Sequence, residues 1–298
     1  MPDDPGAPMD ALMQFLLSGV TVGAVYALVA LGFTIIYNAS DVVNFAQGEF
    51  VMLGGMITVF AFQAGLPLPL AAVIAIAATA AIGVGLNRLA IEPARGAPVV
   101  SLIIITIGAS ILIRGAAQLI FDKQIHRFPA FSGDDPIHMM GATILPQSLW
   151  VIAGAIVVFL ALWLFFKKTL IGKAVLATSN NRTAAQLVGI NTKWVMTLSF
   201  ALSAGIGAFA GVLVTPVTMV SYDVGVALAL KGFAAAMLGG MGNPKGALVG
   251  GLLLGLMEAL TAGYLSSQYK DAVAFIVILG VLFVMPQGLF GKSTTERV

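Results

Sequence analysis

Long runs of hydrophobic residues recur along the whole chain and are separated by short polar segments. Each run is close to the 17 to 25 residues, roughly, that an α-helix needs to cross about 30 Å of hydrocarbon. The runs are continuous and do not alternate between apolar and polar positions, which disfavours the strands of a membrane β-barrel. The pattern predicts an all-α, polytopic bundle of transmembrane helices, with residues 1–298 forming a single transmembrane domain.

We expect spans near residues 11–36, 48–64, 69–87, 99–121, 148–166, 194–216, 225–240, 246–265 and 272–288. Two of them, 48–64 and 225–240, are weaker, because glycines interrupt them and they carry Glu49 and Lys231. Either of these two segments can be a discontinuous or re-entrant helix. The prediction is therefore eight or nine crossings.

Composition narrows the class of protein further. Hydrophobic residues make up 59% of the chain and charged residues 9%, far from the proportions of a soluble domain. The chain has no cysteine and two histidines, so we expect no disulfide and no metal site. Its net charge of +2 is too small to suggest a nucleic-acid partner. The first apolar run is too long for a signal peptide and is expected to be a retained span.

Basic residues are concentrated in segment 167–193, which we expect to be a cytoplasmic loop because such loops are rich in Lys and Arg. With nine crossings, the same side holds ten basic residues: Lys167, Lys168, Lys173, Arg182, Lys193, Arg88, Arg95, Lys245, Lys292 and Arg297. Only Lys123, Arg127 and Lys270 fall on the other side, along with most of the acidic residues, including Asp3, Asp4 and Asp10. This bias predicts an external N-terminus, a cytoplasmic C-terminus and an external loop at 122–147.

Many of the 34 glycines fall four residues apart within the spans, as in Gly19–Gly23, Gly207–Gly211, Gly246–Gly250 and Gly251–Gly255. Lipid gives helices little hydrophobic reason to associate, so close backbone approach at small residues supplies the packing energy. We expect these pairs to be helix contacts.

Ionisable residues within spans are costly and are therefore candidates for function. The chain has four of them: Glu49, Arg114, Lys231 and Glu258. Each also has a structural alternative. Glu49 and Lys231 can lie at the ends of half-helices, and Arg114 can reach the interface or pair with Asp122. Glu258 can pair with Lys231.

The segment Asn44 to Gly48 places amide and backbone groups just before a short helix. Broken helices in transporters expose such groups to a cavity at membrane depth. We therefore predict a polar passage that would release a zwitterion without trapping it. Its candidate lining comprises Asn44, Phe45, Gln47, Glu49, Thr106 and Ser110.

Within the basic segment, residues 181–188 predict a short amphipathic helix. Ser179, Asn180 or Asn181 can cap its start, and Gly189 stands where a helix would stop. One face carries three apolar residues, Ala184, Leu187 and Val188. From the residues alone, this helix can lie on the lipid headgroups or serve as a connector.

Residues 183–189, Thr-Ala-Ala-Gln-Leu-Val-Gly, resemble the Ala-Ala-xxx-Gly element that binding-protein-dependent ABC permeases present to their ATPases. Thr183 stands where many members have Glu. Six further motifs occur in the family's order: Leu31-Gly32-Phe33, Asn44-Phe45-Ala46-Gln47-Gly48-Glu49, Thr106-Ile107-Gly108, Leu238-Gly239-Gly240-Met241-Gly242-Asn243, Gly246-Ala247 and Pro286-Gln287-Gly288-Leu289-Phe290-Gly291. Over nearly its whole length the chain resembles the branched-chain amino acid permease family, in particular the shorter of its two permease subunits.

The resemblance implies a permease subunit of an ABC importer in the bacterial inner membrane, without an ATPase site or a cofactor of its own. It would move branched-chain amino acids or a related small amide or carboxylate. It would pair with a homologous permease subunit, two cytoplasmic ATPases that hold ATP and Mg, and an extracytoplasmic solute-binding protein. The residues that would bind the ATPases are Arg182, Thr183, Ala184, Ala185, Gln186, Leu187 and Gly189.

Two alternatives remain open from the sequence. One is a stand-alone channel or secondary transporter, which would need no ATPase. The other is an intramembrane enzyme, which is disfavoured because the spans contain no Ser and Lys pair or paired Asp at helical spacing. Solute identity also stays open, because the resemblance is equally compatible with importers of urea, short amides and aromatic acids.

Overall fold

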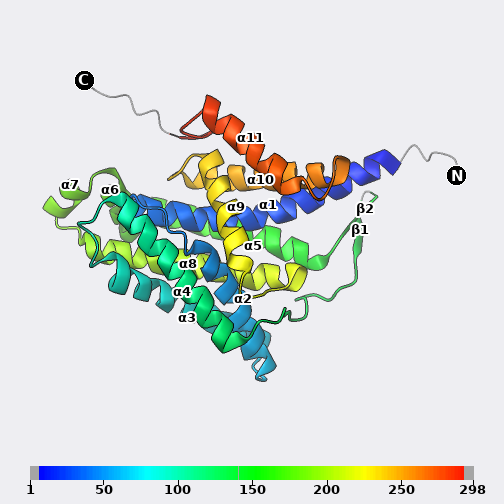
Figure 1. Cartoon of the computed structure of the whole chain (residues 1–298), viewed down its shortest axis with the longest axis horizontal. Helices are drawn as coiled ribbons and strands as arrows, with labels where there is room; N and C mark the ends of the chain where they lie inside the picture. The colour runs from blue at the N-terminus through cyan, green and yellow to red at the C-terminus, as the bar shows by residue number, and fades with distance from the viewer. Residues whose placement is uncertain (1–6, 140, 292–298) are drawn as a thin grey trace.

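The computed structural model describes residues 7–139 and 141–291, and most of these residues are helical (Figure 1). The elements in chain order are α1 (Ala7–Ser40), α2 (Gln47–Gln63), α3 (Leu68–Leu86), a π-helical turn η1 (Asn87–Ile91), α4 (Val99–Phe121), β1 (Ile137–Met139), β2 (Ala142–Ile144), α5 (Pro146–Lys168), α6 (Leu170–Asn180), α7 (Arg182–Leu187), α8 (Thr192–Thr218), α9 (Val224–Gly239), α10 (Pro244–Tyr264) and α11 (Lys270–Val284). The helical, polytopic prediction is confirmed.

Within the described residues, six helices are long and apolar enough to cross a membrane: α1, α3 with η1, α4, α5, α8 and α10. Each coincides with a predicted span to within a few residues, and α4 matches its predicted bounds of 99–121. Helices are expected in these segments, because an α-helix satisfies every backbone polar group internally where water is absent.

The remaining three predicted spans form shorter helices. Helices α2, α9 and α11 have 17, 16 and 15 residues. At 1.5 Å per residue they are about 23 to 26 Å long, less than the roughly 30 Å of a hydrocarbon core. The count of eight or nine crossings, which needs two or all three of them, therefore stays a prediction.

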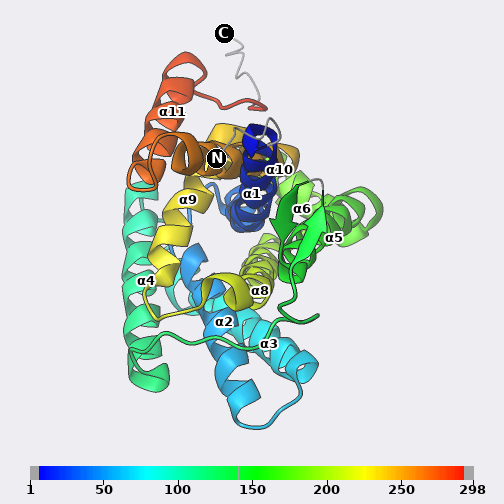
Figure 2. The same ribbon diagram turned by 90° about the vertical axis from the view of Figure 1, so that its right-hand side faces the viewer.

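Helix α1 is the central helix of the bundle, and Figure 2, which looks nearly along it, shows α5, α8, α9 and α10 around it. Its residues from 24 to 31 are all buried. Its closest neighbour is α10, whose Gly255 and Gly251 abut the backbone of Gly23 and Ala27. Gly19 continues the same face of α1 against α10. The prediction that these glycine pairs make helix contacts is confirmed.

The other two glycine pairs also lie at close contacts between helices. A Cβ atom on Gly207 of α8 would lie 2.9 Å from the Cβ of Phe50 in α2, and one on Gly211 would meet the α2 backbone. Gly246 and Gly250 of α10 abut the backbone of α9. Small residues therefore set the spacing of α1, α2, α8, α9 and α10.

The two ends of the bundle differ in structure. Helices α6 and α7 lie at one end, and the antiparallel β1–β2 hairpin lies at the other (Figure 1). The hairpin is fastened to α1, since Gln14 and Thr143 exchange hydrogen bonds of 2.9 and 2.7 Å. The two loops predicted on opposite sides of the membrane are thus at opposite ends. Asp3, Asp4, Lys292 and Arg297, which entered the charge count, lie outside the described residues.

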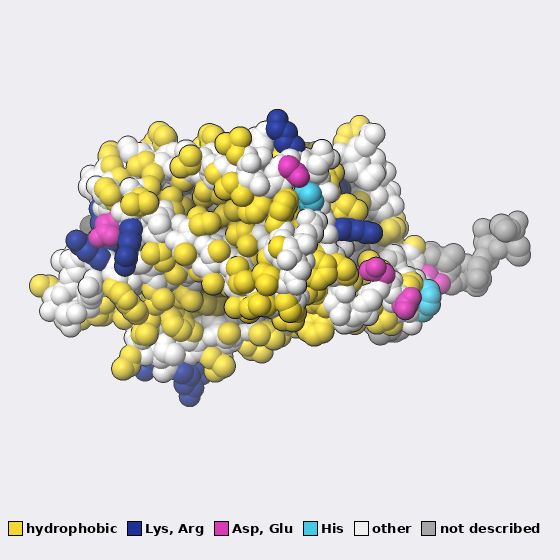
Figure 3. Space-filling view, turned by 90° about the horizontal axis from the view of Figure 1, so that it is seen from below, with side chains coloured by type: hydrophobic (Ala, Val, Ile, Leu, Met, Phe, Trp, Pro, Cys, Tyr) yellow, Lys and Arg dark blue, Asp and Glu magenta, His cyan; other side chains and the backbone are white. Residues whose placement is uncertain are grey.

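Between the two ends the surface is largely apolar. Figure 3 shows a face on which hydrophobic side chains cover the middle and charged side chains lie toward the edges. Large apolar residues on α3, α4 and α5 are exposed, among them Val73, Leu112 and Val157. A surface of this kind is expected where lipid or another membrane helix covers the protein.

The glycine contacts make a testable prediction. In Gly23→Ala the new Cβ would lie 2.8 Å from Leu252 Cα, so α1 and α10 must move apart. We expect a loss of about 1–3 kcal/mol of stability, the usual cost of overpacking, measured by thermal unfolding in detergent. Gly115→Ala on α4 is the control, because no atom of another described helix or loop lies within 4 Å of the position that its new Cβ would take. Equal stability of the two variants would contradict the close packing of α1 on α10.

Candidate functional site

Helix α7, in the basic segment, lies within one residue of its predicted bounds at each end. Among the three candidate caps it is Asn181 whose side chain accepts a hydrogen bond, 2.9 Å long, from the Ala184 amide. The helix ends before Gly189, whose φ of +88° lies in the left-handed region that glycine adopts without strain. The predicted helix at 181–188 is confirmed as Arg182–Leu187.

The side chains of α7 mostly face away from the rest of the protein. Ala185 is the anchor, being only 3% exposed. Leu187 and Val188 are 84% and 77% exposed, and Ala184 beside them is exposed as well. Thr183 and Gln186 are also exposed, while Arg182 is half-buried. The predicted apolar face is therefore an uncovered apolar surface at the tip of the bundle.

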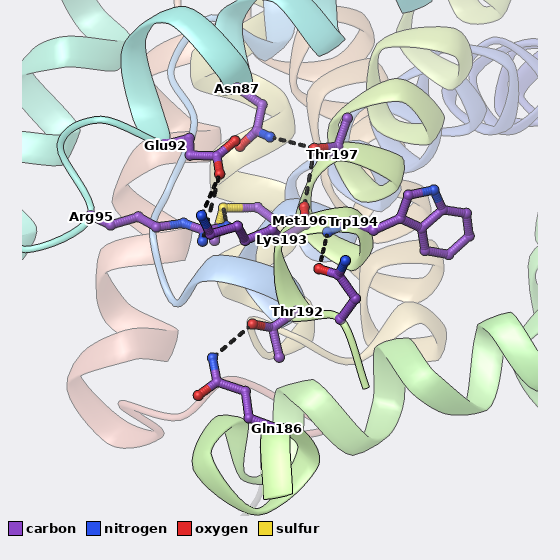
Figure 4. Close-up of polar contacts among 10 residues, drawn as sticks. Asn87, Glu92, Arg95, Gln186, Thr192, Lys193, Trp194, Met196 and Thr197 are labelled. Carbon is purple, nitrogen blue, oxygen red and sulfur yellow. Dashed lines mark hydrogen bonds and ion pairs between the residues drawn. The ribbon is translucent and has the colours of Figure 1, made fainter. Parts of the chain in front are cut away.

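Helix α7 is connected to the start of α8 by side chains. Gln186 donates a 2.9 Å hydrogen bond to the hydroxyl of Thr192, which is buried at the first position of α8 (Figure 4). Asn191, the residue between the loop and α8, caps that helix by accepting from the Trp194 amide at 3.1 Å. A displacement of α7 would therefore act on the N-terminal end of α8.

A second set of contacts joins the same end of α8 to η1, as Figure 4 also shows. Asn87 donates to the Thr197 hydroxyl at 2.9 Å, and Lys193 pairs with Glu92 at 3.6 Å. Arg95 lies 3.9 Å from Glu92. Burial lowers the pKa of Arg95, and the like charge of Arg182 acts in the same direction. The charge on α7 thus lies within electrostatic reach of this cluster.

The predicted passage residues lie together in a buried polar layer among α1, α2, α4 and α8. The side chain of Gln47 is held by Ser203 of α8, with hydrogen bonds of 3.2 Å to its carbonyl and 2.6 Å from its hydroxyl. The Ser203 hydroxyl oxygen also lies 2.8 Å from the carbonyl oxygen of Gly32 in α1, so its one hydrogen is shared between two acceptors. Phe45 donates its amide to the Thr106 hydroxyl at 3.2 Å. Five of the six predicted residues are buried, and Phe45 is half-buried.

Glu49 lies in the first turn of α2, within this layer. One carboxylate oxygen accepts a 2.8 Å hydrogen bond from Ser110 of α4. The other faces Gly225 of α9 and has no hydrogen-bond partner among the described residues. Arg114 lies one turn beyond Ser110 on the same helix. The structure thus brings Glu49 and Ser110 together, and the part of all three residues in translocation stays a prediction.

The other two intramembrane charges form the predicted pair. Lys231 of α9 binds Glu258 of α10 at 2.8 Å and Asp271 of α11 at 2.7 Å. Glu258 also accepts a 2.7 Å hydrogen bond from Tyr26 of α1. Sequence reasoning did not single out Tyr26 or Asp271 as partners, because no local pattern signals a contact between positions so far apart.

The alternative pairing of Arg114 with Asp122 is not found among the described residues. Asp122 follows the last turn of α4 and lies 2.9 Å from a ring nitrogen of His126, which also packs against Phe60. The hydrogen bond with His126 lowers the pKa of Asp122. His126 further pairs its backbone with Val220, so this contact holds the loop after α4 against the end of α8.

Comparison with known proteins bears on all these features. The family model described as "Branched-chain amino acid transport system / permease component" matches residues 15–282. The high-affinity branched-chain amino acid transport system permease protein LivH of Escherichia coli strain K12 is 33% identical, over 96% of this chain and 97% of LivH. BraD, the corresponding permease protein of Pseudomonas aeruginosa, is 33% identical over 96% of this chain and 98% of BraD.

More distant likenesses extend beyond amino acid permeases. The ribose import permease protein RbsC of Haemophilus influenzae is 27% identical over 87% of this chain and 81% of RbsC. Among solved structures, PsaBC from Streptococcus pneumoniae in complex with Fab aligns over 95% of this chain at 16% identity. Its TM-score of 0.46 is too low to support an argument about the fold.

The family match and the two 33% identical relatives each extend over most of the chain. They agree with the helical, multi-pass architecture, and the relatives named are permease subunits. The chain therefore belongs to the permease component family of branched-chain amino acid transport systems.

Proposed function

We propose that this chain is the permease subunit of a binding-protein-dependent ABC importer for branched-chain amino acids or a related small amide or carboxylate. In this proposal it is not an enzyme and binds no cofactor. ATP and Mg are held by two cytoplasmic ATPases, and a homologous second permease subunit and an extracytoplasmic solute-binding protein complete the transporter. The 33% identity to LivH and BraD supports the solute class.

The observation that carries the proposal is the uncovered apolar surface of α7. Leu187 and Val188 lie at the tip of a helix that is fixed by its Asn181 cap and by Ala185. Exposed apolar side chains on a rigid helix in an otherwise polar loop mark a protein interface. An ATPase that binds α7 is the partner that a permease without its own energy source needs.

Helix α8 provides a physical route from the docking helix to the predicted passage. Its first residue, Thr192, receives the hydrogen bond from Gln186 of α7. Further along the same helix, Ser203 binds Gln47 and Gly32 in the buried polar layer. ATPases that bind α7 differently in two states would shift α8, and with it this layer, between two arrangements.

The passage proposed for the solute is the layer of Asn44, Phe45, Gln47, Glu49, Thr106 and Ser110. Glu49 is bonded to Ser110, Gln47 to Ser203 of α8, and the backbone amide of Phe45 to Thr106, so the layer is closed in this arrangement. Opening it would free amide, hydroxyl and carboxyl groups that can replace the hydration of a passing zwitterion. Glu49, with one unpartnered buried oxygen among the described residues, is the group best able to contact an ammonium.

The membrane arrangement proposed is a single domain in the bacterial inner membrane. It has nine crossings that include α2, α9 and α11, an external N-terminus and a cytoplasmic C-terminus. The segment 167–193 is its cytoplasmic coupling loop. Two observations support this orientation: basic residues gather in that segment, and α6–α7 and the hairpin lie at opposite ends of the bundle.

Docking through α7 predicts the effect of charged residues on its apolar surface. We expect Leu187→Asp combined with Val188→Asp to reduce ATPase co-purification at least about tenfold, which corresponds to roughly 1.4 kcal/mol. Both side chains are mostly exposed, so the permease itself should fold normally. Thr183→Glu is the control. It places an acid on the same helix, at the position where many family members have Glu, and should keep ATPase binding and solute uptake.

Uptake by the Leu187→Asp, Val188→Asp permease at the wild-type rate, without bound ATPases, would favour the stand-alone channel or secondary transporter instead. Retention of the ATPases at wild-type levels would place the docking surface elsewhere.

The orientation can be tested directly, because the chain has no cysteine. Single cysteines in Asp134→Cys and Asn180→Cys lie on exposed residues at opposite ends of the bundle. In intact spheroplasts, a membrane-impermeant maleimide should label the cysteine of Asp134→Cys at once, and that of Asn180→Cys only after lysis. The reverse pattern would overturn the proposed orientation, and labelling of both before lysis would contradict their separation across the membrane.

A further inference from the structure

A cavity of about 390 Å³ lies beside the central helix, bounded by α1, α5, α8, α9 and α10. Its lining includes Val217 and Thr218 at the end of α8, and Val151 in the second turn of α5. These residues place it in the half of the bundle that carries the β1–β2 hairpin. In the proposed orientation this is the external half, where solute enters.

One end of the cavity is formed by charged and polar side chains. Lys231, Glu258, Lys270 and Tyr26 all line it. Glu258 is only 6% exposed, and it accepts hydrogen bonds from Tyr26 at 2.7 Å and from Lys231 at 2.8 Å. Asp271 binds Lys231 at 2.7 Å, so the positive charge of that lysine is already balanced by two carboxylates.

Both lysine ammonium groups can take a further partner: Lys231 has three N–H donors for its two carboxylate partners, and Lys270 is freer still. Its nitrogen is 3.7 Å from the Glu258 carboxylate, which is too long for a hydrogen bond, and its side chain is 42% exposed. A ligand carboxylate placed between Lys270 and Lys231 would meet two ammonium groups. A ligand ammonium would meet the buried carboxylate of Glu258. The site therefore offers opposite charges at neighbouring positions.

The rest of the cavity is lined mainly by branched aliphatic side chains, including Val22, Val25, Val151, Val214 and Leu228. Aside from the charged end, the lining residues with hydroxyl groups are Thr21 and Thr218. A sugar would leave most of its hydroxyls without partners on such walls, at a cost for each group. A small apolar side chain would lose water and gain packing contacts there.

We propose that this cavity is a binding site for an α-amino acid with a branched aliphatic side chain. The ligand carboxylate binds Lys270 and Lys231, its ammonium binds Glu258, and its side chain lies among Val25, Val151 and Val214. The inference rests on the proposed function, since it names where an importer of this solute class holds the solute before the buried polar layer opens. A zwitterion suits the site because it brings both charges and no net charge into the membrane.

The ion pairs alone would also fasten α9, α10 and α11 together. A purely structural role predicts that loss of the charges lowers stability and leaves ligand preference unchanged. A binding role predicts that filling the apolar part of the cavity, with every charge left in place, weakens ligand binding as well. The test therefore needs one variant that fills the cavity and one that removes a charge.

The experiment measures equilibrium binding of radiolabelled L-leucine to the assembled transporter in nanodiscs, without the solute-binding protein. We expect saturable binding, weakened at least tenfold by Leu228→Trp, which fills the cavity, and by Glu258→Gln, which keeps an oxygen for the Tyr26 hydrogen bond. Leu230→Trp is the matched control, because Leu230 is an exposed residue on the same helix and outside the cavity lining. Its leucine affinity should equal that of the wild type.

Two analogues separate the charges of the ligand. 4-Methylpentanoate lacks the ammonium and 3-methylbutylamine lacks the carboxylate, so each should compete with leucine at least tenfold more weakly than valine does. Equal competition by either analogue would overturn the proposed zwitterion site. Absence of saturable leucine binding, or unchanged affinity in Glu258→Gln, would overturn it too, even if Leu228→Trp fails to fold.

The same preparations report separately on the proposed function. ATPase co-purification and leucine uptake, with the binding protein added, are measured beside leucine binding. Wild-type uptake with no leucine site on the permease would leave the proposed function standing and refute this inference. Absence of both ATPases and uptake would refute the proposed function itself.

Discussion

The close approach of α1 and α10 is the contact on which the rest of the arrangement depends. Glycines on both helices let the two backbones touch, which replaces the hydrophobic driving force that lipid does not supply. Because residues 24–31 of α1 are then fully buried, polar groups in and next to this stretch have partners on the surrounding helices. Tyr26 finds Glu258, and the Gly32 carbonyl finds Ser203. The packing thus determines where both polar regions of the interior can form.

These two regions divide the interior by chemistry. The layer around Gln47 and Glu49 is closed by internal hydrogen bonds, whereas the Lys231–Glu258 pair stands at the wall of a cavity. Removing one partner of a buried ion pair is costly, because it leaves the other charge uncompensated. A zwitterionic ligand avoids that cost, because it brings one charge of each sign to the ion pair. In the proposed function, solute enters beside the ion pair and the polar layer is the closed barrier.

Local signals in the sequence predicted local structure well. The apolar run at 99–121 ends at Asp122, and α4 ends before it. Asn181 and Gly189 delimit α7, and the pairing of Lys231 with Glu258 follows from the cost of leaving either charge alone in a span. Helix α6 and the hairpin were not predicted. The residues of α6 mix polar and apolar types within the basic segment, so no clear helical pattern stands out there. Strands of three residues are too short to show a period of two.

Contacts between distant positions could not be predicted from the sequence. Ser203 and Gln47 are 156 positions apart, and nothing in either segment points to the other. The exposure of α7 is a similar case. The sequence shows that Ala184, Leu187 and Val188 share a face, but the three-dimensional structure is needed to show that this face is turned away from the bundle. The two interpretations of that face differ only in what covers it, which is lipid headgroups in one and an ATPase in the other.

The central claim is that α8 carries the movement of the docking helix to the buried polar layer. The most direct measurement is the number of leucine molecules imported per ATP hydrolysed by the reconstituted transporter carrying Thr192→Val, which removes the hydroxyl that accepts from Gln186. The account predicts that the ATPases stay bound and hydrolyse ATP while this ratio falls several-fold. A ratio equal to that of the wild type would contradict the claim that this contact connects α7 to α8.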